Sequence, residues 1–175
     1  MDAYSARPTP AILHDGSAWR RLRKEDVTAL TEAATRKAFY RDGLTDEQIA
    51  ENRRVVEISA SCCEAAARNA HQRFSAAFVG ETFAGYMIAT RHGPDDLELD
   101  WLMIAPAFHG SGVAGALMAA GLDWLGADRP VWLNVIAYNQ RAIHFYRKFG
   151  FEIDPEAKAS RLVPNLIMRR PPDGS

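Results

Sequence analysis

The sequence predicts an α/β fold, specifically a mixed sheet of parallel and antiparallel strands that is covered by helices. Residues 97–126 have the pattern of a buried strand, a glycine-rich turn and a helix, because apolar residues first alternate and then recur at helical spacing. The apolar strand at residues 131–137 completes a strand–helix–strand unit, which implies a right-handed parallel pair. Two strands within residues 74–90 flank Gly80-Glu81-Thr82, a hairpin signal that adds antiparallel neighbours.

The first part of the chain is expected to contain little regular structure before its first helix. Residues 1–16 include Pro8, Pro10 and Gly16 and few core-type residues, which predicts a loose leader. Trp19–Arg23 is a candidate for a short strand. Asp26 is a good N-cap for a helix with an apolar side formed by Val27, Leu30, Ala34 and Ala38.

A second helical region follows the break at Asp42 and Gly43. Thr45 and Gln48 have the spacing of a capping box, which marks the start of a helix. The helical pattern runs to about His71, and the sequence leaves open whether this is one long helix or two shorter ones.

The last part of the chain reads as a helix followed by two strands. Asn139 is a candidate N-cap for a helix that Gly150 closes. Residues 151–153 begin one strand, and residues 162–168 form the last one. Pro164 places the start of that last strand at an edge or a bulge, since proline cannot donate to a ladder.

The expected order of elements is β-α-α-β-β-β-α-β-α-β-β, in a single domain over residues 17–170 with a polar tail at residues 171–175. With 175 residues, 47% of them hydrophobic, the chain can bury one core. The formal net charge of -1 argues against a general binder of nucleic acids or membrane surfaces. No apolar run approaches the ~20 residues of a spanning helix, and the N-terminus lacks a signal pattern.

The cysteines indicate a reducing compartment. Cys62 and Cys63 are adjacent, which suits a disulfide between them poorly, so we expect free thiols in a cytoplasmic protein. No set of Cys and His residues has the spacing of a metal site, and we expect no metal.

Two motifs lie at the glycine-rich turn and at the helix after the parallel strand. Ile104-Ala-Pro106 followed by His109-Gly-Ser-Gly-Val-Ala114 resembles the acyl-CoA-binding motif of the GNAT superfamily of N-acetyltransferases. That motif reads Arg or Gln, two residues, Gly, one residue, then Gly or Ala, and His109 departs from it. The family's second motif, a strand, an Asn and a helix ending in Tyr-x-x-x-Gly-Phe, is similar to Leu133, Val135, Asn139, Ala142, Tyr146 and Gly150-Phe151.

The resemblance implies an acyltransferase that uses acetyl-CoA as its co-substrate. The turn and helix start would offer backbone N–H groups to the pyrophosphate, and the residues concerned are His109, Gly110, Ser111, Gly112, Val113 and Ala114. In the family, the preceding strand splays from its neighbour and pairs with the pantetheine arm, a role that falls here on Leu102, Met103 and Ile104. Asn139, Ala142 and Tyr146 would complete the acetyl-CoA site.

The resemblance also suggests how protons move during the reaction. Tyr146 falls on the family's usual general-acid position, and a phenol with a pKa near ~10 is protonated at neutral pH. Glu98 lies eleven residues before His109, which matches the position of a glutamate base in some members. It would act directly or through water, and many members use water chains instead. Asp100 projects from the same side of the strand.

The acceptor is the least defined part of the prediction. Phe39, Tyr40, Asp100 and Trp101, together with Glu98, suggest aromatic and acidic walls that suit the cationic primary amine of a small molecule or peptide. The sequence does not identify this amine. Dimerisation is common in the family, so a homodimer is a further expectation, whereas nucleic-acid and membrane partners are not expected.

Two other functions fit part of the sequence. A member of this fold could bind CoA without catalysis and act as a sensor or interaction domain, although the presence of Tyr146 and Asn139 argues against it. Gly110, Gly112 and Gly115 also spell the G-x-G-x-x-G fingerprint of NAD(P)-binding folds. That fingerprint requires an acidic residue after the second strand, and the strand at 131–137 ends instead in Tyr138 and Asn139.

Overall fold

A mixed sheet runs through the protein in a computed structural model that describes residues 8–126, 128–158 and 160–174. Within those residues seven strands lie in the order β1-β2-β3-β4-β5-β7-β6. Strands β4 and β5 are parallel, and the other neighbouring pairs are antiparallel. The predicted mixed α/β fold is therefore confirmed.

The elements have the following bounds. The strands are β1 (Ala11–His14), β2 (Gln72–Val79), β3 (Thr82–Gly93), β4 (Asp96–Ile104), β5 (Val131–Ile136), β6 (Glu152–Ile153) and β7 (Asn165–Arg170). The helices are α1 (Asp15–Trp19), α2 (Lys24–Thr35), α3 (Asp46–Ala66), the short 3-10 helix η1 (Pro106–Phe108), α4 (Val113–Leu125) and α5 (Gln140–Arg147).

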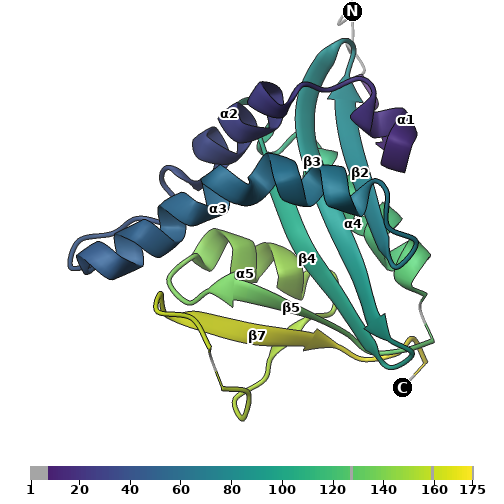
Figure 1. The fold of residues 1–175 in the computed structure, drawn as a ribbon. Helices are drawn as coiled ribbons and strands as arrows, with labels where there is room; N and C mark the ends of the chain where they lie inside the picture. The colour runs from purple at the N-terminus through teal and green to yellow at the C-terminus, as the bar shows by residue number, and fades with distance from the viewer. Residues whose placement is uncertain (1–7, 127, 159, 175) are drawn as a thin grey trace, which may run out of the picture.

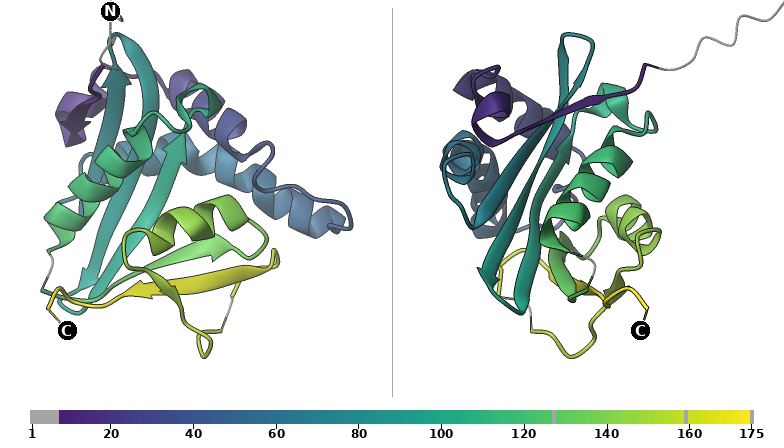
Figure 2. Two further views of the ribbon diagram at one scale, coloured as in Figure 1. Left: turned by 180° about the vertical axis from the view of Figure 1, so that it is seen from behind. Right: turned by 90° about the vertical axis from the view of Figure 1, so that its right-hand side faces the viewer.

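Helices cover both faces of the sheet. Helices α1, α2 and α3 lie on one face (Figure 1), and α4 and α5 lie on the other (Figure 2). Each face has its own apolar cluster, with Phe74 and Tyr86 on the α1–α3 side and Leu117 and Leu133 on the α4–α5 side. The buried Tyr86 hydroxyl has a hydrogen-bond partner in Thr31 Oγ1 at 2.6 Å. Burial of this polar group therefore costs the folded protein little stability.

The N-terminal predictions need two corrections. Residues 11–14 of the expected loose leader form β1, which pairs with β2 from Ala11↔Phe78 to His14↔Ser75. Because this pairing joins segments that are far apart in the sequence, the residues around β1 carry no local pattern that predicts it. Residues 1–7 of the expected leader lie outside the described residues. The predicted strand at Trp19–Arg23 is wrong, because Trp19 ends α1 and its ring packs edge-on against Phe74 at 5.9 Å.

The starts of α2 and α3 differ in how well local chemistry predicted them. Helix α2 begins at Lys24 with Arg23 as its N-cap, so the assignment of Asp26 as the cap is wrong. Asp26 instead occupies the third helical position and accepts the Arg23 backbone N–H at 3.1 Å. The Thr45–Gln48 capping box is confirmed, and α3 is one continuous helix.

The C-terminal predictions are closer to the structure. The predicted hairpin is confirmed by the pairing of Val79 with Thr82. Gly126 follows the end of α4 with a φ of 97°, and the Asn139 side chain caps α5 as expected. Strand β7 begins after Pro164 rather than at residue 162, since a ladder donor is needed from its first residues.

The centre of the sheet opens at β4. The ladder between β4 and β5 consists, in the described residues, of Leu97↔Val131 and Glu98↔Trp132. Beyond Glu98 the two strands part, while β3 continues to pair with β4 up to Ile104. A bulge leaves Asp100 without a partner on β3. A cleft therefore begins at Asp100 and widens toward the end of β4.

A glycine at the closest approach of β3 and β4 gives a test of this packing. A Cβ on Gly85 would lie 2.8 Å from both Ile104 Cδ1 and the Met103 carbonyl oxygen. The backbone oxygen can move away only if strand β4 shifts. Gly85→Ala should therefore lower the free energy of unfolding by roughly 1–3 kcal/mol, measured by urea unfolding. Gly93→Ala is the matched control, since its Cβ would meet nothing within 4 Å. Equal unfolding midpoints for the two variants would contradict the packing.

Candidate active site

The cleft between β4 and β5 holds a cavity of about 480 Å³. It is lined from β4 and β5, from η1 and the glycine loop, from α2, α3 and α5, and from the segment before β7. The lining residues expected from the sequence are Phe39, Asp100, Trp101, Leu102, Met103, Ile104, His109, Gly110, Gly112, Ala114, Asn139, Ala142 and Tyr146. The structure therefore brings most of the predicted site into one cavity.

Four predicted residues lie elsewhere. Ser111 and Tyr40 are not among the residues that line the cavity, and a contact between Tyr40 and the acceptor stays a prediction. Val113 is fully buried beneath the loop, and its side chain packs into the core. Glu98 is buried behind the cavity wall with 8% of its surface exposed. Of these, Glu98 keeps a connection to the cavity through its neighbour Asp100.

The outer half of β4 provides the floor of the cleft. Leu102, Met103 and Ile104 pair with β3 on one side, while among the described residues no strand pairs with their other side. Extended backbone with an unpaired edge can add a further extended segment through main-chain hydrogen bonds. The floor is thus suited to an extended ligand that carries amide groups.

The glycine loop closes one end of the cleft. Gly110 and Gly112 have φ values of 75° and 90°, and a Cβ at either position would meet nothing within 4 Å. Their positive φ explains why glycine is needed, and the open space leaves the backbone accessible. Helix α4 begins directly afterwards at Val113, so its unpaired first-turn N–H groups and positive dipole end face the loop. Such a helix start favours an anionic ligand.

His109 stands beside the helix start. Burial and the nearby Arg141 guanidinium lower the pKa of the His109 imidazole, against the opposing effect of the Ile104 backbone. A lowered pKa favours the neutral ring at neutral pH, so His109 contributes a hydrogen-bonding group rather than a fixed charge. Arg141 and Lys148, both on the cavity wall, are the cations of this end.

Helix α5 brings a phenol to the cleft. Asn139 Oδ1 accepts the Ala142 N–H at 3.3 Å, which fixes the first turn of α5 at the cavity wall. One turn further on, Tyr146 packs edge-on against Phe145 and Phe151, with ring centroids 5.6 Å and 6.1 Å away. Burial raises the pKa of Tyr146 to about 12. Its hydroxyl is therefore protonated at any pH at which the protein would normally work.

Two carboxyls lie side by side on β4. Asp100 lines the cavity and is reached by solvent, yet the surrounding walls remove part of its hydration and raise its pKa. Burial and the neighbouring charge of Asp100 raise the pKa of Glu98 to about 7, even though His92 Nε2 lies 2.6 Å from its Oε2 and opposes the shift. Two interacting carboxyls titrate as a pair, so the protonation of each depends on the charge of the other.

The mouth of the cavity next to these carboxyls is mostly apolar. Trp101 and Phe39 are joined there by small apolar side chains, namely Ala34 of α2, Ala38 of the turn after α2 and Val55 of α3. Arg161, from the segment before β7, adds a positive charge that lowers the pKa of both Glu98 and Asp100. This mouth combines an acidic pair, apolar walls and one guanidinium.

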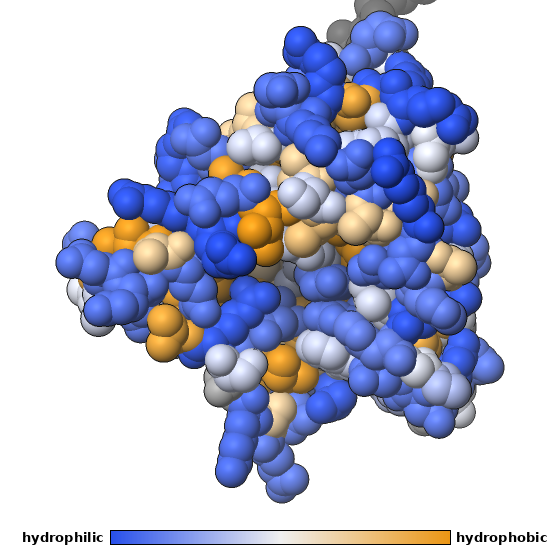
Figure 3. Space-filling model, viewed as in Figure 1, coloured by the Kyte–Doolittle hydropathy of each residue, from blue (hydrophilic) through white to orange (hydrophobic). Residues whose placement is uncertain are grey.

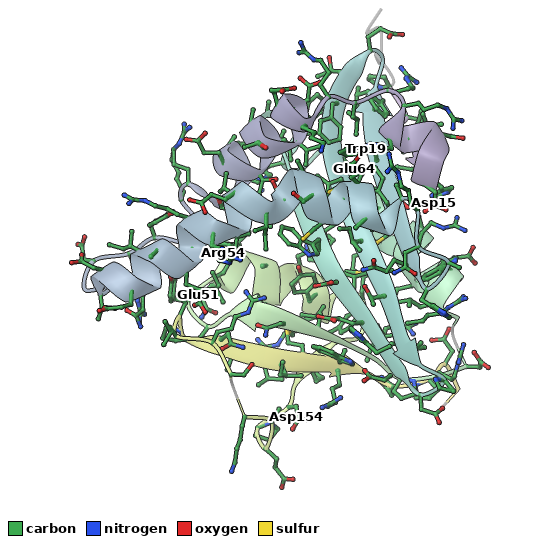
Figure 4. All side chains as sticks on the ribbon, viewed as in Figure 1. Asp15, Trp19, Glu51, Arg54, Glu64 and Asp154 are labelled. Carbon is green, nitrogen blue, oxygen red and sulfur yellow. The ribbon has the colours of Figure 1, made fainter. Side chains whose placement is uncertain are left out.

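A carboxylate of α3 holds the segment that carries Arg161. Glu51 Oε1 accepts the Leu162 N–H at 3.2 Å, and Oε2 accepts the Val163 N–H at 2.8 Å. Gln48 donates to the Leu162 carbonyl at 2.9 Å from the preceding turn. Figure 4 shows Glu51 on the side of α3 that faces this segment. Leu162 itself is 62% exposed, and Figure 3 shows separate apolar patches within a mostly hydrophilic surface on this face of the molecule.

Several lining residues were missed by sequence reasoning. Asn134, Val135 and Ile136 line the cavity from β5. The expected separation of the two parallel strands was the signal that could have predicted them, since it exposes the end of β5 to the cleft. His92 lies one residue before the end of β3 and contacts Glu98, which sequence reasoning did not predict. The available signal was the turn at Pro94 and Asp95, since it folds β3 back onto β4. Arg161 had no local signal.

The other sequence expectations concern cysteines, metals and membranes. Cys62 and Cys63 are both free, and burial raises the pKa of each thiol. Across the described part of the chain, no cluster of three or more His, Cys, Asp or Glu side chains has the arrangement of a metal site. None of the helices in the described residues is both long and apolar enough to span a bilayer.

Residues 21–151 match the model of the acetyltransferase (GNAT) family. Uncharacterized N-acetyltransferases of Mycobacterium tuberculosis and Mycobacterium bovis are 47% identical to this chain over 74 residues, which are 40% of this chain and 46% of theirs. The aligned stretch thus spans about half the length of these relatives.

Solved structures share the fold. The PaiA N-acetyltransferase from Thermoplasma acidophilum, in complex with coenzyme A, has a TM-score of 0.68 at 20% identity and covers 93% of this chain and 99% of its own. A nourseothricin acetyltransferase is 29% identical with a TM-score of 0.51, over 59% of this chain and 66% of its own.

The Glu51 contacts predict how the mouth of the cavity responds to mutation. Glu51→Ala removes the acceptor of two backbone N–H groups, and hydrogen bonds to a charged group contribute about 1.5–3 kcal/mol. Amide exchange at Leu162 and Val163 should therefore accelerate about tenfold or more, measured by hydrogen–deuterium exchange. Glu57→Ala is the matched control, because Glu57 is exposed on the same helix. Unchanged exchange at both amides in Glu51→Ala would contradict the assigned contacts.

Proposed function

The chain belongs to the acetyltransferase (GNAT) family, and on that premise we propose that it transfers the acetyl group of acetyl-CoA to a primary amine. The observation that carries this proposal is the cleft between β4 and β5, which joins an unpaired strand edge to a glycine loop at a helix start. These two features suit the two ends of one ligand, an amide-bearing arm and a pyrophosphate.

The residues present fit acetyl-CoA. The edge at Leu102, Met103 and Ile104 would pair with the pantetheine amides, and the open backbone at Gly110 and Gly112 would receive the pyrophosphate. The cations at that end, Arg141 and Lys148, oppose the phosphate charge. When bound, acetyl-CoA supplies the activated thioester.

Tyr146 is the proposed general acid. It lines the cavity from α5, and its raised pKa keeps the phenol protonated while the thiolate needs a proton or a strong hydrogen bond. A backbone N–H of β4 near Met103 would polarise the carbonyl that is attacked. In this proposal α5 provides the proton donor for the leaving sulfur, and β4 provides the hydrogen-bond donor for the acyl oxygen.

The carboxyl pair is the proposed base. Amines are protonated at neutral pH and must lose a proton before they attack. Asp100 is the member that reaches the cavity, and Glu98, with a pKa near the operating pH, is the member that stores the proton. The base role first predicted for Glu98 is therefore proposed here for the pair, acting directly or through a water molecule.

The proposed acceptor is a cationic amine on a small molecule or a peptide. An acidic pair between apolar walls attracts an ammonium group and shields it from bulk water. Trp101 and Phe39 provide flat apolar surface for the carbon skeleton of the acceptor. A homodimer stays a prediction.

An acceptor screen tests the proposed function. Release of free CoA thiol would be followed with amino acids, polyamines, aminoglycosides, nourseothricin and peptide N-termini, each with acetyl-CoA. We expect turnover with at least one cationic amine. Turnover with anionic acceptors alone would overturn the proposed acceptor class. Calorimetric binding of acetyl-CoA without thiol release in any reaction would replace the enzyme by a CoA-binding sensor.

The acid role gives a second test. Tyr146→Phe removes the hydroxyl and keeps the ring, so kcat should fall by more than about tenfold, as expected for loss of a general acid. The affinity for CoA, measured by calorimetry, should stay nearly unchanged. Tyr40→Phe is a matched control, since Tyr40 lies outside the cavity lining. A kcat equal to that of the unmodified protein would remove Tyr146 from the acid role.

A further inference from the structure

The buried Glu98 carboxyl connects two separate hollows of the molecule. On one side lies Asp100, which lines the cavity between β4 and β5. On the other side lies His92, whose Nε2 is 2.6 Å from Glu98 Oε2. The His92 side chain is 42% exposed and lines a second groove together with Thr90 and with residues of the segments that follow α3 and α4, among them His71 and Arg129. Glu98 itself lines neither hollow.

This arrangement addresses a problem in the proposed reaction. Each turnover takes a proton from the acceptor, and a buried carboxyl that has received it must release it before the next cycle. With an acceptor in the mouth of the cavity, the direct route from Asp100 to solvent is obstructed. A second route through His92 leads to solvent without passing the substrates.

We propose that Asp100, Glu98 and His92 form a proton path from the acceptor cavity to the solvent of the second groove, with His92 as the exit group. This inference rests on the proposed acetyl transfer. His92 touches neither substrate and acts through Glu98, so it is a positioning and relay residue rather than a catalytic one.

The proton balance of the path is simple. The acceptor ammonium gives one proton to the Asp100 carboxylate, directly or through one water molecule, and becomes a neutral amine. The proton passes to Glu98, which gives one to His92 Nε2. The imidazolium then releases the proton on its other nitrogen, Nδ1, to water in the groove, and exchange of ring protons through that water restores the tautomer with a bare Nε2 before the next cycle. One proton enters from the acceptor and one leaves to solvent, and no oxidant or reductant is needed.

The surroundings of His92 hold the ring in place and set its charge. The ring stacks on Trp132 of β5 with centroids 6.1 Å apart, and Trp132 Nε1 donates to Asp96 Oδ1 at 2.7 Å. The contact with Glu98 raises the pKa of His92, and Asp96 and Asp100 act in the same direction. The charged or titratable groups that share the groove are His71, Arg91 and Arg129.

The two arginines of the groove donate hydrogen bonds to backbone carbonyls and cannot carry a proton. His92 is therefore the group that can relay one between Glu98 and the groove. Arg91 donates to the Trp124 carbonyl, and Arg129 donates to the Pro94 carbonyl. A guanidinium keeps its proton at any physiological pH, so neither arginine can relay one. His71 lines the groove without a contact to Glu98 among the described interactions.

The test compares His92→Gln with His71→Gln, a matched change in the same groove. In dilute, non-imidazole buffer, kcat of His92→Gln should fall about tenfold, which is less than the roughly 10²–10⁴-fold contribution of a direct acid or base, because His92 acts through Glu98. Added imidazole should restore it in a saturable manner, because a small base in the groove replaces the missing ring. His71→Gln and the unmodified enzyme should not respond to imidazole.

The pH profile provides a second readout. The rate of the unmodified enzyme should rise with pH through about 7, because Glu98 must be deprotonated to accept the proton. His92 lowers the pKa of Glu98, so this limb should move to higher pH in His92→Gln. An NMR titration of the His92 ring supports the same coupling without turnover: its pKa should fall in Glu98→Gln.

The outcomes separate the relay from the proposed function. Absence of thiol release by the unmodified enzyme with every amine would overturn the acetyl-transfer proposal, and the relay with it. Release at equal rates by the unmodified enzyme and His92→Gln would overturn the relay alone. A loss that imidazole does not restore would likewise reduce His92 to a structural support of Glu98.

Discussion

The parting of β4 and β5 is the constraint on which the rest of the structure depends. Buried backbone groups need hydrogen-bond partners, so a sheet opens in its middle only where the strands are held from elsewhere. β3 pairs with β4 along its length, and β7 pairs with β5 from Val131 to Ile136. Each strand is therefore fixed on its far side. The opening is a rigid part of the fold, and the exposed edge of β4 is prepared for an extended ligand.

The same opening explains why groups of opposite chemistry meet in one cavity. Helix α5 follows β5 and carries Tyr146 to the cleft from one side, while β4 carries Asp100 from the other. The phenol and the carboxyl pair both have raised pKa values because they have lost hydration. For Tyr146 that shift preserves a proton donor, and for Glu98 it produces a group that exchanges protons near neutral pH. One physical cause, the loss of hydration, thus underlies both of the proposed roles, the acid and the base.

Features encoded in contiguous residues could be predicted from the sequence, and features that depend on distant segments could not. The glycine loop, the Asn139 cap and the Thr45–Gln48 box have their causes within a few residues, and the structure contains all three. The pairing of β1 with β2 joins segments about sixty residues apart and had no local signal. The absence of Tyr40 from the cavity lining likewise had no signal in the sequence, since the direction of a loop side chain depends on packing rather than on pattern.

The contact between His92 and Glu98 lay beyond prediction for a more specific reason. Bulges at Asp100 and between Arg91 and Gly93 change the β3–β4 register, and a one-residue change in register alters which side chains share a face. His92 has no Cα partner on β4, so its position follows from the bulge rather than from the alternation of the strand. A buried carboxyl lowers stability unless a partner offsets its lost hydration. His92 supplies that partner at 2.6 Å, and an apolar residue in place of Glu98 would need none. The buried pair therefore departs from the local rules of core packing in the way that residues of a functional cluster often do, which is the reason we propose a role for it in proton transfer.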